Sequence, residues 1–201
     1  MFLTPIRAAL AAALAAGALL TACSSMDGMG DMGGGMDSSA QATVMVGGAA
    51  MYPTKTIVEN AVNSRDHTTL VAAVTAAGLV DTLNGPGPFT VFAPTNAAFA
   101  KLPAGTVDTL VMPANKAMLT KILTYHVVAG RVTAADLAAQ IRAGGGQARL
   151  TTVEGGTLTA SMRGGSVILT DEKGGVATVT QADVMQSNGV IHVTDTVSMP
   201  N

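Results

Sequence analysis

The chain has few of the residues on which many kinds of site depend. Among 201 residues it has one cysteine, no tryptophan, two tyrosines and four phenylalanines. A single cysteine excludes an internal disulfide and a cysteine-based zinc site. So few aromatic side chains leave no platform on which bases or sugars could stack. The sequence therefore gives no reason to expect a cofactor.

Charge is equally scarce. Charged residues make up 12% of the chain and the formal net charge is -2, so no basic stripe can neutralise nucleic-acid phosphates and we expect no nucleic-acid partner. The apolar fraction is an ordinary 48%, which is enough to fill a core. Neither a G-X-Y period nor sustained heptads occur, which excludes collagen-like and coiled-coil classes.

The first 22 residues have the pattern of a signal peptide. Arg7 supplies a positive charge, and residues 8–20 form an uninterrupted run of Ala, Leu and one Gly. This run is shorter than the ~20 residues needed to span a bilayer, but its length suits the apolar region of an export signal. We therefore expect residues 1–22 to direct export and to be removed.

The signal ends in Leu20-Thr21-Ala22-Cys23, which resembles the lipobox of bacterial lipoproteins. The resemblance implies that Cys23 is lipidated and becomes the mature N-terminus, anchored in a membrane through its acyl chains. The alternative is a plain export signal that leaves Cys23 as a free thiol, a liability in an oxidising envelope. Because Ser24 stands where an aspartate favours inner-membrane retention, the outer membrane is favoured if the host is Gram-negative.

Residues 23–50 are predicted to be a flexible tether. They are rich in Gly, Ser and Asp and show no apolar period, so they cannot bury enough surface to offset the entropy of ordering. A Gly-rich coil of this length has a root-mean-square reach of roughly 30 Å. Residues 51–201 then read as one domain, long enough for its own core.

Four methionines in the tether, spaced three or four residues apart, suggest an alternative function. They are Met26, Met29, Met32 and Met36. Thioethers are soft ligands that suit Cu(I), and their reversible oxidation can also scavenge oxidants. An envelope copper-binding or oxidant-protective protein is therefore the alternative, against a low-complexity linker that merely uses methionine.

The first half of the domain has helical periodicity, with one strand. Helices are predicted over 54–62, over 66–77 with Asp66 as cap, over 96–102 with Thr95 as cap, from Pro113 onward, and from Thr133 onward. Residues 89–93 form the strand. The helix after Pro113 is expected to turn four side chains inward, namely Met118, Leu119, Ile122 and Leu123.

The second half alternates with a period of two. Strands are predicted over 147–153, 157–162, 166–171, 176–181 and 189–197, with glycine pairs between the middle runs that suit successive hairpins. Helices first and strands later favour an α+β fold class.

Three motifs in this order resemble the fasciclin (FAS1) domain family. They are TVFAPTNAAF at 90–99, ILTYHVV at 122–128 and NGVIHVTD at 188–195, supported by IVENA at 57–61 and LVAAV at 70–74. The resemblance covers about residues 54–200. It implies a wedge-shaped β-sandwich with a helical layer, and a function in adhesion or in interaction with a protein or matrix partner.

The Tyr125-His126 pair is the candidate binding element, because the corresponding segment of some animal relatives is proposed to take part in integrin binding. The competing interpretation is a mostly buried His126 whose ring nitrogens are hydrogen-bonded at a helix-to-strand junction. Asp183 lies where some animal members carry an adhesion segment, but the preceding Gln181-Ala182 departs from that pattern, so integrin binding is not carried over.

The remaining titratable residues suggest no catalytic site. His67 is expected to be exposed, and His192 to face either solvent or a second packed layer; the spacing of the histidines offers no local metal chelate. No G-x-S-x-G elbow occurs, and Asp171 with Glu172 reads as a solvated hairpin. We therefore predict a non-catalytic protein without a metal site.

Overall fold

The computed structural model describes residues 43–201, and the signal peptide, Cys23 and the four tether methionines lie outside the described residues. Strands β1 (Val44–Val46) and β2 (Ala49–Met51) pair antiparallel as a hairpin. The hairpin occupies the last positions that we assigned to the tether. Its inward side chains Val46 and Met51 are 4% and 2% exposed, so apolar burial draws this segment into the domain.

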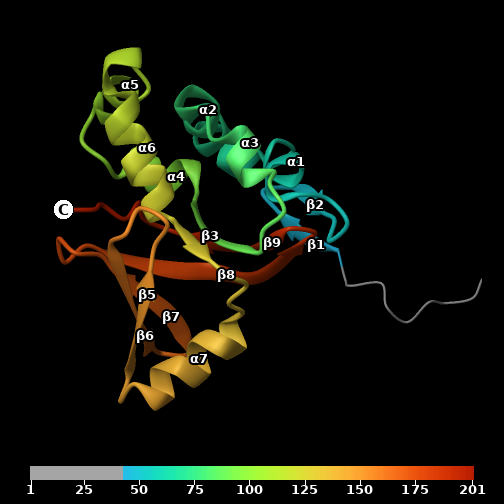
Figure 1. The fold of residues 1–201 in the computed structure, drawn as a ribbon, viewed down its shortest axis with the longest axis vertical. Coiled ribbons are helices and arrows are strands. Elements are labelled where there is room, and N and C mark those ends of the chain that lie inside the picture. The colour runs from blue at the N-terminus through green and yellow to red at the C-terminus, as the bar shows by residue number, and fades with distance from the viewer. Residues whose placement is uncertain (1–42) are drawn as a thin grey trace, which may run out of the picture. The chain divides into compact units, whose positions relative to one another are not determined.

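A seven-stranded sheet organises the domain, and its strand order is β4-β3-β9-β8-β7-β6-β5 (Figure 1). The strands are β3 (Phe89–Pro94), β4 (Val127–Ala129), β5 (Gln147–Thr151), β6 (Thr157–Arg163), β7 (Ser166–Thr170), β8 (Val176–Gln186) and β9 (Gly189–Thr194). The predicted α+β class and the successive hairpins β5 to β9 are confirmed. Strand β9 also pairs parallel with β3, which brings the first motif beside the third.

The two layers of the expected sandwich are one continuous sheet. The first residues of β8 pair with β7, and its remainder, from Val179 onward, pairs with β9 with register shifts between Val179 and Val184. A β-bulge bends a strand and lets it pass from one layer to the next. The sheet nearly closes, because Val128 forms a bridge with Thr152 and the Val153 N–H donates to the Val127 carbonyl at 2.7 Å.

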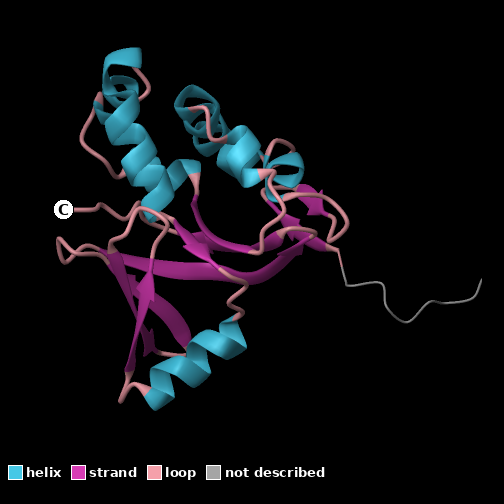
Figure 2. Cartoon of the chain, in the orientation of Figure 1, coloured by secondary structure: helices cyan, strands magenta, loops and turns pink. Residues whose placement is uncertain are grey.

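Helices cover this sheet on two sides, as Figure 2 shows. On one side lie α1 (Ile57–Ala61), the 3-10 turn Arg65–His67, α2 (Thr68–Ala77), α3 (Val80–Leu83), α4 (Asn96–Ala100), α5 (Thr106–Leu110), the 3-10 turn Pro113–Asn115 and α6 (Lys116–Tyr125). Helix α7 (Ala134–Ala143) packs against β5, β6 and β7. Each side has its own apolar core, centred on the α1–α6 helices and on α7 respectively. Among the described residues, none of the helices has both the length and the apolar character that crossing a bilayer would require.

Side-chain caps explain where several helices begin. Thr95 accepts from the Ala98 N–H at the start of α4, and Thr133 and Asp136 form a reciprocal capping box on α7, as predicted. The predicted Asp66 cap on α2 is wrong. Asn96 supplies that cap from α4, because its Oδ1 accepts from the Thr69 N–H at 3.0 Å.

One core prediction on α6 is also wrong. Leu119, Ile122 and Leu123 are buried as expected, whereas Met118 is 60% exposed. Met118 lies one position before Leu119 and therefore about 100° away around the helix, on the edge that turns to solvent.

Candidate functional site

The Tyr125-His126 pair lies where α6 ends and β4 begins, and both side chains are buried. Tyr125 is 0% exposed and belongs to the α7 core, whereas His126 is 3% exposed and lines the other side. The structure thus gives the pair a packing role at the helix-to-strand junction. A partner could not contact either side chain directly without displacing the residues that cover it.

The ring nitrogens of His126 both have backbone partners. Nδ1 lies 2.8 Å from the Ile122 carbonyl, so it must donate, and Nε2 accepts from the Ser198 N–H at 3.0 Å. This pattern requires the neutral imidazole with its proton on Nδ1. Burial lowers the pKa of His126, and the opposing influence of the Ile122 carbonyl and Asp171 does not reverse the shift. The interpretation of His126 as a buried residue with both ring nitrogens hydrogen-bonded is confirmed.

Tyr125 ties α6 to the hairpins of the far layer. Its hydroxyl donates to the Thr157 carbonyl at 2.8 Å and accepts from the Glu172 N–H at 3.2 Å. Burial, together with the carboxylates of Glu172, Asp171 and Glu154, raises the pKa of Tyr125 to about 12. The phenol therefore stays protonated and acts as a structural donor.

Asp171 corrects the expectation of a solvated hairpin. Its side chain is only 8% exposed and accepts from three backbone N–H groups, those of Lys173, Gly175 and Met199. These bonds hold the β7–β8 turn and the C-terminal segment together. Asp171 is therefore part of the framework and not a free acid.

The other two histidines are buried as well. His67 is 3% exposed, so its predicted exposure is wrong; its Nδ1 shares a 2.8 Å hydrogen bond with the Ser64 hydroxyl, and its Nε2 has no partner in the described part of the chain. His192 is 0% exposed and stacks on Phe92 with 5.5 Å between ring centroids. This settles the two options left open for His192 in favour of a second packed layer.

Asp183 has a structural task. It is the residue at which β8 bulges, with a φ of 58°, and its Oδ1 accepts from the Ala134 N–H at 2.7 Å, the first residue of α7. Its own N–H donates to His192 Nδ1 at 3.3 Å, and His192 Nε2 donates to the Val132 carbonyl at 2.8 Å. At the place of the animal adhesion segment, this chain thus has hydrogen bonds from Asp183 and His192 that hold the start of α7.

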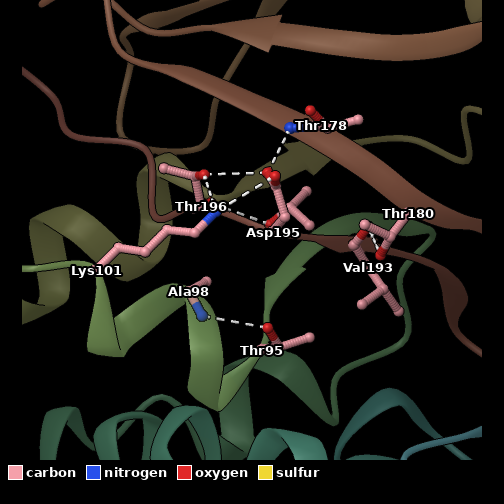
Figure 3. Close-up of polar contacts among 9 residues, drawn as sticks. Thr95, Ala98, Lys101, Thr178, Thr180, Val193, Asp195 and Thr196 are labelled. Carbon is pink, nitrogen blue, oxygen red and sulfur yellow. Dashed lines mark hydrogen bonds and ion pairs between the residues drawn. The ribbon is translucent and has the colours of Figure 1, made fainter.

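A polar cluster lies at the end of β9, shown in Figure 3. Asp195 Oδ1 accepts from the Thr178 N–H at 2.7 Å and from the Thr196 hydroxyl at 3.0 Å, and Lys101 lies 3.4 Å from Oδ2. Burial raises the pKa of Asp195, but these three donors outweigh it and hold the pKa below its ordinary value. The cluster joins β8, β9 and the end of α4.

Replacing Asp195 with alanine should lower the free energy of unfolding by about 1–2 kcal/mol, because bonds to a charged acceptor are lost at a partly exposed site. Urea denaturation at pH 7 measures this. Lys101→Ala is the control and should cost less, since the Lys101 and Asp195 side chains are 53% and 38% exposed. Because the folded-state pKa is depressed, the Asp195 contribution is present above pH ~4 and disappears as the pH falls through that lower pKa. A loss for Asp195→Ala no larger than that for Lys101→Ala at pH 7 would contradict this assignment.

An apolar cavity of about 180 Å³ lies between the helices and the sheet. Helices α1, α2 and α3 form one wall, and β3, the end of α6 and the start of β4 form the other. It reaches the surface, since Val62 and Val153 in its wall are 53% and 48% exposed. The sequence predicted only helices over 54–62 and 66–77, because periodicity shows which side chains share a face but not where two packed faces leave a gap.

The described residues offer neither a cluster for a metal ion nor an exposed hydroxyl–imidazole pair. Within residues 43–201, no three His, Cys, Asp or Glu side chains lie close enough together to hold a metal ion. The Ser64–His67 pair has hydroxyl–imidazole geometry, but both residues are at most 3% exposed. What the domain presents to its surroundings is therefore apolar concavity and weakly charged surface.

Comparisons with known proteins agree with the resemblance that the motifs suggested. A model of the fasciclin domain matches residues 65–200. Protein sll1483 of Synechocystis is 49% identical over 162 residues, covering 81% of this chain and 83% of that protein. The cell surface glycolipoprotein MPB83 of Mycobacterium bovis is 64% identical over 55 residues, which cover 27% of this chain and 24% of that protein.

The fold has a solved counterpart. The FAS1 domain pair from the insect cell adhesion molecule fasciclin I superimposes with a TM-score of 0.65 at 21% identity. The match covers 73% of this chain and 51% of that one. At this level of identity the likeness concerns the fold alone.

Proposed function

The chain belongs to the fasciclin domain family, and from that premise we propose that it is a non-catalytic, lipid-anchored cell-envelope protein whose domain mediates adhesion or contact with a protein or matrix partner. One observation carries the proposal: the polar side chains of its motifs are consumed by bonds inside the domain. Tyr125, His126 and His192 are each buried with backbone partners. Because these side chains are buried and hydrogen-bonded inside the domain, they are not available as nucleophiles or general bases, which favours a binding role over a catalytic one.

The anchor is supported by the sequence and by one relative. Cys23 follows an apolar run of export-signal length by only two residues. A relative that is 64% identical to this chain over 55 residues is named a cell surface glycolipoprotein. A residue carrying two or more acyl chains would hold the domain at a membrane stably. Residues 24–42 would then separate the folded domain from the lipid headgroups.

Cells that express the full chain should incorporate an alkyne-tagged fatty acid into it, and Cys23→Ser should abolish the label. Mass spectrometry of the mature N-terminal peptide should find acyl chains on Cys23 and no residues before it. Ser25→Ala is the matched control, since it alters a neighbouring hydroxyl and keeps the cysteine. An unlabelled chain whose N-terminus carries an unmodified thiol would show that the anchor does not exist.

Contact with a macromolecular partner is tested by photo-cross-linking in living cells. A photoreactive amino acid at Met112 or Met118, which are 53% and 60% exposed, should give discrete high-mass adducts with protein or polysaccharide. The same amino acid at buried Leu137, which is 0% exposed, is the background control. Deletion of the gene should also reduce cell aggregation or attachment to a matrix. Absence of adducts across a scan of exposed positions, with unchanged attachment, would contradict the proposed function.

A further inference from the structure

We propose that the apolar cavity between the α1–α3 helices and β3 is a binding site for one end of a small, uncharged, hydrocarbon-like molecule. The inference goes beyond the proposed adhesive function and does not depend on the lipid anchor. It follows from the volume of the cavity, the chemistry of its wall and the character of its mouth.

The wall has no charged side chain, and most of its polar groups are already hydrogen-bonded within the protein. Its side chains are aliphatic or aromatic apart from three threonines and His126. The hydroxyls of Thr75 and Thr124 are bonded to the Val71 and Thr120 carbonyls of their own helices, each at 2.8 Å. Both nitrogens of His126 are also used, so the ring presents only carbon. A charged or strongly polar ligand would lose its water here without gaining partners.

The volume is large enough to hold a ligand. In another protein, an engineered cavity of ~150 Å³ lined by Leu, Ile and Phe stays dry and binds benzene. The cavity here measures about 180 Å³ and includes Leu70, Val74 and Phe92 in its wall. Water gains little in such a space because it needs two to four polar partners. An apolar ring or a short branched chain would restore the contacts that the empty wall lacks.

The mouth indicates that the ligand can be longer than the cavity. Val62 and Val153 belong to the wall and are also about half exposed, so apolar surface continues outward from the cavity. Glu154, which follows Val153 in the chain, pairs with Lys121 at 3.7 Å. A fatty-acid carboxylate would have to compete with Glu154 for this ammonium group.

Toluene is a suitable probe, and the chain from residue 23 onward with Cys23→Ser needs no detergent that would compete for the cavity. Toluene should raise the melting temperature with concentration, by roughly 3 °C at ten times its Kd. Benzoate and benzylamine, which have the same ring and one charge each, should raise it by less than a third as much.

Two substitutions on α2 locate the effect. Val71 is half-buried in the cavity wall, so Val71→Phe should fill the space and abolish the response to toluene. Ala72→Phe is the matched control, because Ala72 is exposed on the same helix outside the wall. It should retain the full response.

Loss of the toluene response in Val71→Phe, with retention in Ala72→Phe, supports the site. No rise up to the solubility limit of toluene, an equal rise in Val71→Phe, or an equal rise with benzoate overturns it. If Val71→Phe does not fold, methyl NMR of the chain without that substitution decides. Shifts confined to methyl groups of the cavity wall, such as those of Val71, Val74 and Leu83, support the site, and shifts confined to methyl groups outside the wall overturn it. Failure of fatty-acid labelling at Cys23 leaves this result unaffected, so the two proposals fail separately.

Discussion

Replacing Phe92 with alanine should lower the free energy of unfolding by about 3–5 kcal/mol. Phe92 is 1% exposed, stacks on His192 at 5.5 Å, and packs in the same core as Tyr125 and Val128. Its removal opens a void beside an existing cavity, so the transfer and cavity penalties add. Denaturation in urea, with the slope compared between variants, gives the loss directly.

The same strand provides a control for this prediction. Phe89 begins β3 and is only half-buried, so Phe89→Ala should cost clearly less than Phe92→Ala. Phe99, 8% exposed in the α1–α6 core, should behave like Phe92. A loss below ~1 kcal/mol for Phe92→Ala would mean that this ring does not support the core.

Acidification should destabilise the domain steeply, beginning near pH 6.5. The chain has three histidines, and all are buried: His67 and His126 are 3% exposed and His192 is 0% exposed. Burial lowers the pKa of each below its ordinary value. His126 and His192 each accept a backbone N–H on one nitrogen and donate from the other, so a second proton would break a bond inside the protein.

The sign of the effect follows from proton linkage. Below pH 6.5 the unfolded chain takes up protons on its histidines while the folded chain does not, so the free energy of unfolding falls as the pH falls. Each histidine that stays neutral contributes a slope of up to ~1.4 kcal/mol per pH unit. Three together approach ~4 kcal/mol per unit, a large part of the 5–15 kcal/mol typical of a domain.

Urea denaturation between pH 7.5 and pH 5 measures this slope, and NMR titration of the imidazole protons gives the midpoints, expected below 6.5. His126→Gln should reduce the slope by about one histidine's share. Glu59→Gln is the control: hydrogen bonds from Thr56 lower the pKa of Glu59, so it titrates below this window and the slope should not change. A flat profile between pH 7 and 5 would falsify the prediction.

Local signals in the sequence were enough to place most elements. The Thr133–Asp136 box marks the start of α7, and Thr95 marks the start of α4. Gly78, with a φ of 72°, ends α2 where the prediction placed it. These features depend on residues within one helical turn of each other, which is why periodicity and capping chemistry predict them.

Features that depend on distant residues could not be predicted in this way. Asn96 caps α2 across 27 positions of sequence, whereas the pattern favoured the nearby Asp66. His67 was predicted to be a surface residue in the first turn of a helix. The β1–β2 hairpin packs against Ser64, the hydrogen-bond partner of His67, so closely that a Cβ at Gly47 would lie 2.4 Å from Ser64 Oγ. The hairpin itself was interpreted as tether because its two strands are only three residues long.

The same distinction between features set by nearby residues and features set by distant ones applies to the candidate site. The buried, bonded His126 could be inferred from the apolar residues on either side of it. The cavity could not, because it arises from how closely α1 and α2 approach β3 and β4, a tertiary distance of which the sequence pattern carries no trace. Its wall residues are the same ones that periodicity assigns to the core.

The position of β9 constrains the order in which the domain can form. This strand, from Gly189 to Thr194, lies between β3 and β8 in the interior of the sheet, although its first residue is far along the chain from Phe89, with which it pairs. Until it emerges from the ribosome, β3 and β8 have no partner that joins them, and the two cores cannot be brought together. A chain whose synthesis has not yet passed Thr194 therefore cannot complete this sheet, however well its earlier helices and hairpins have formed.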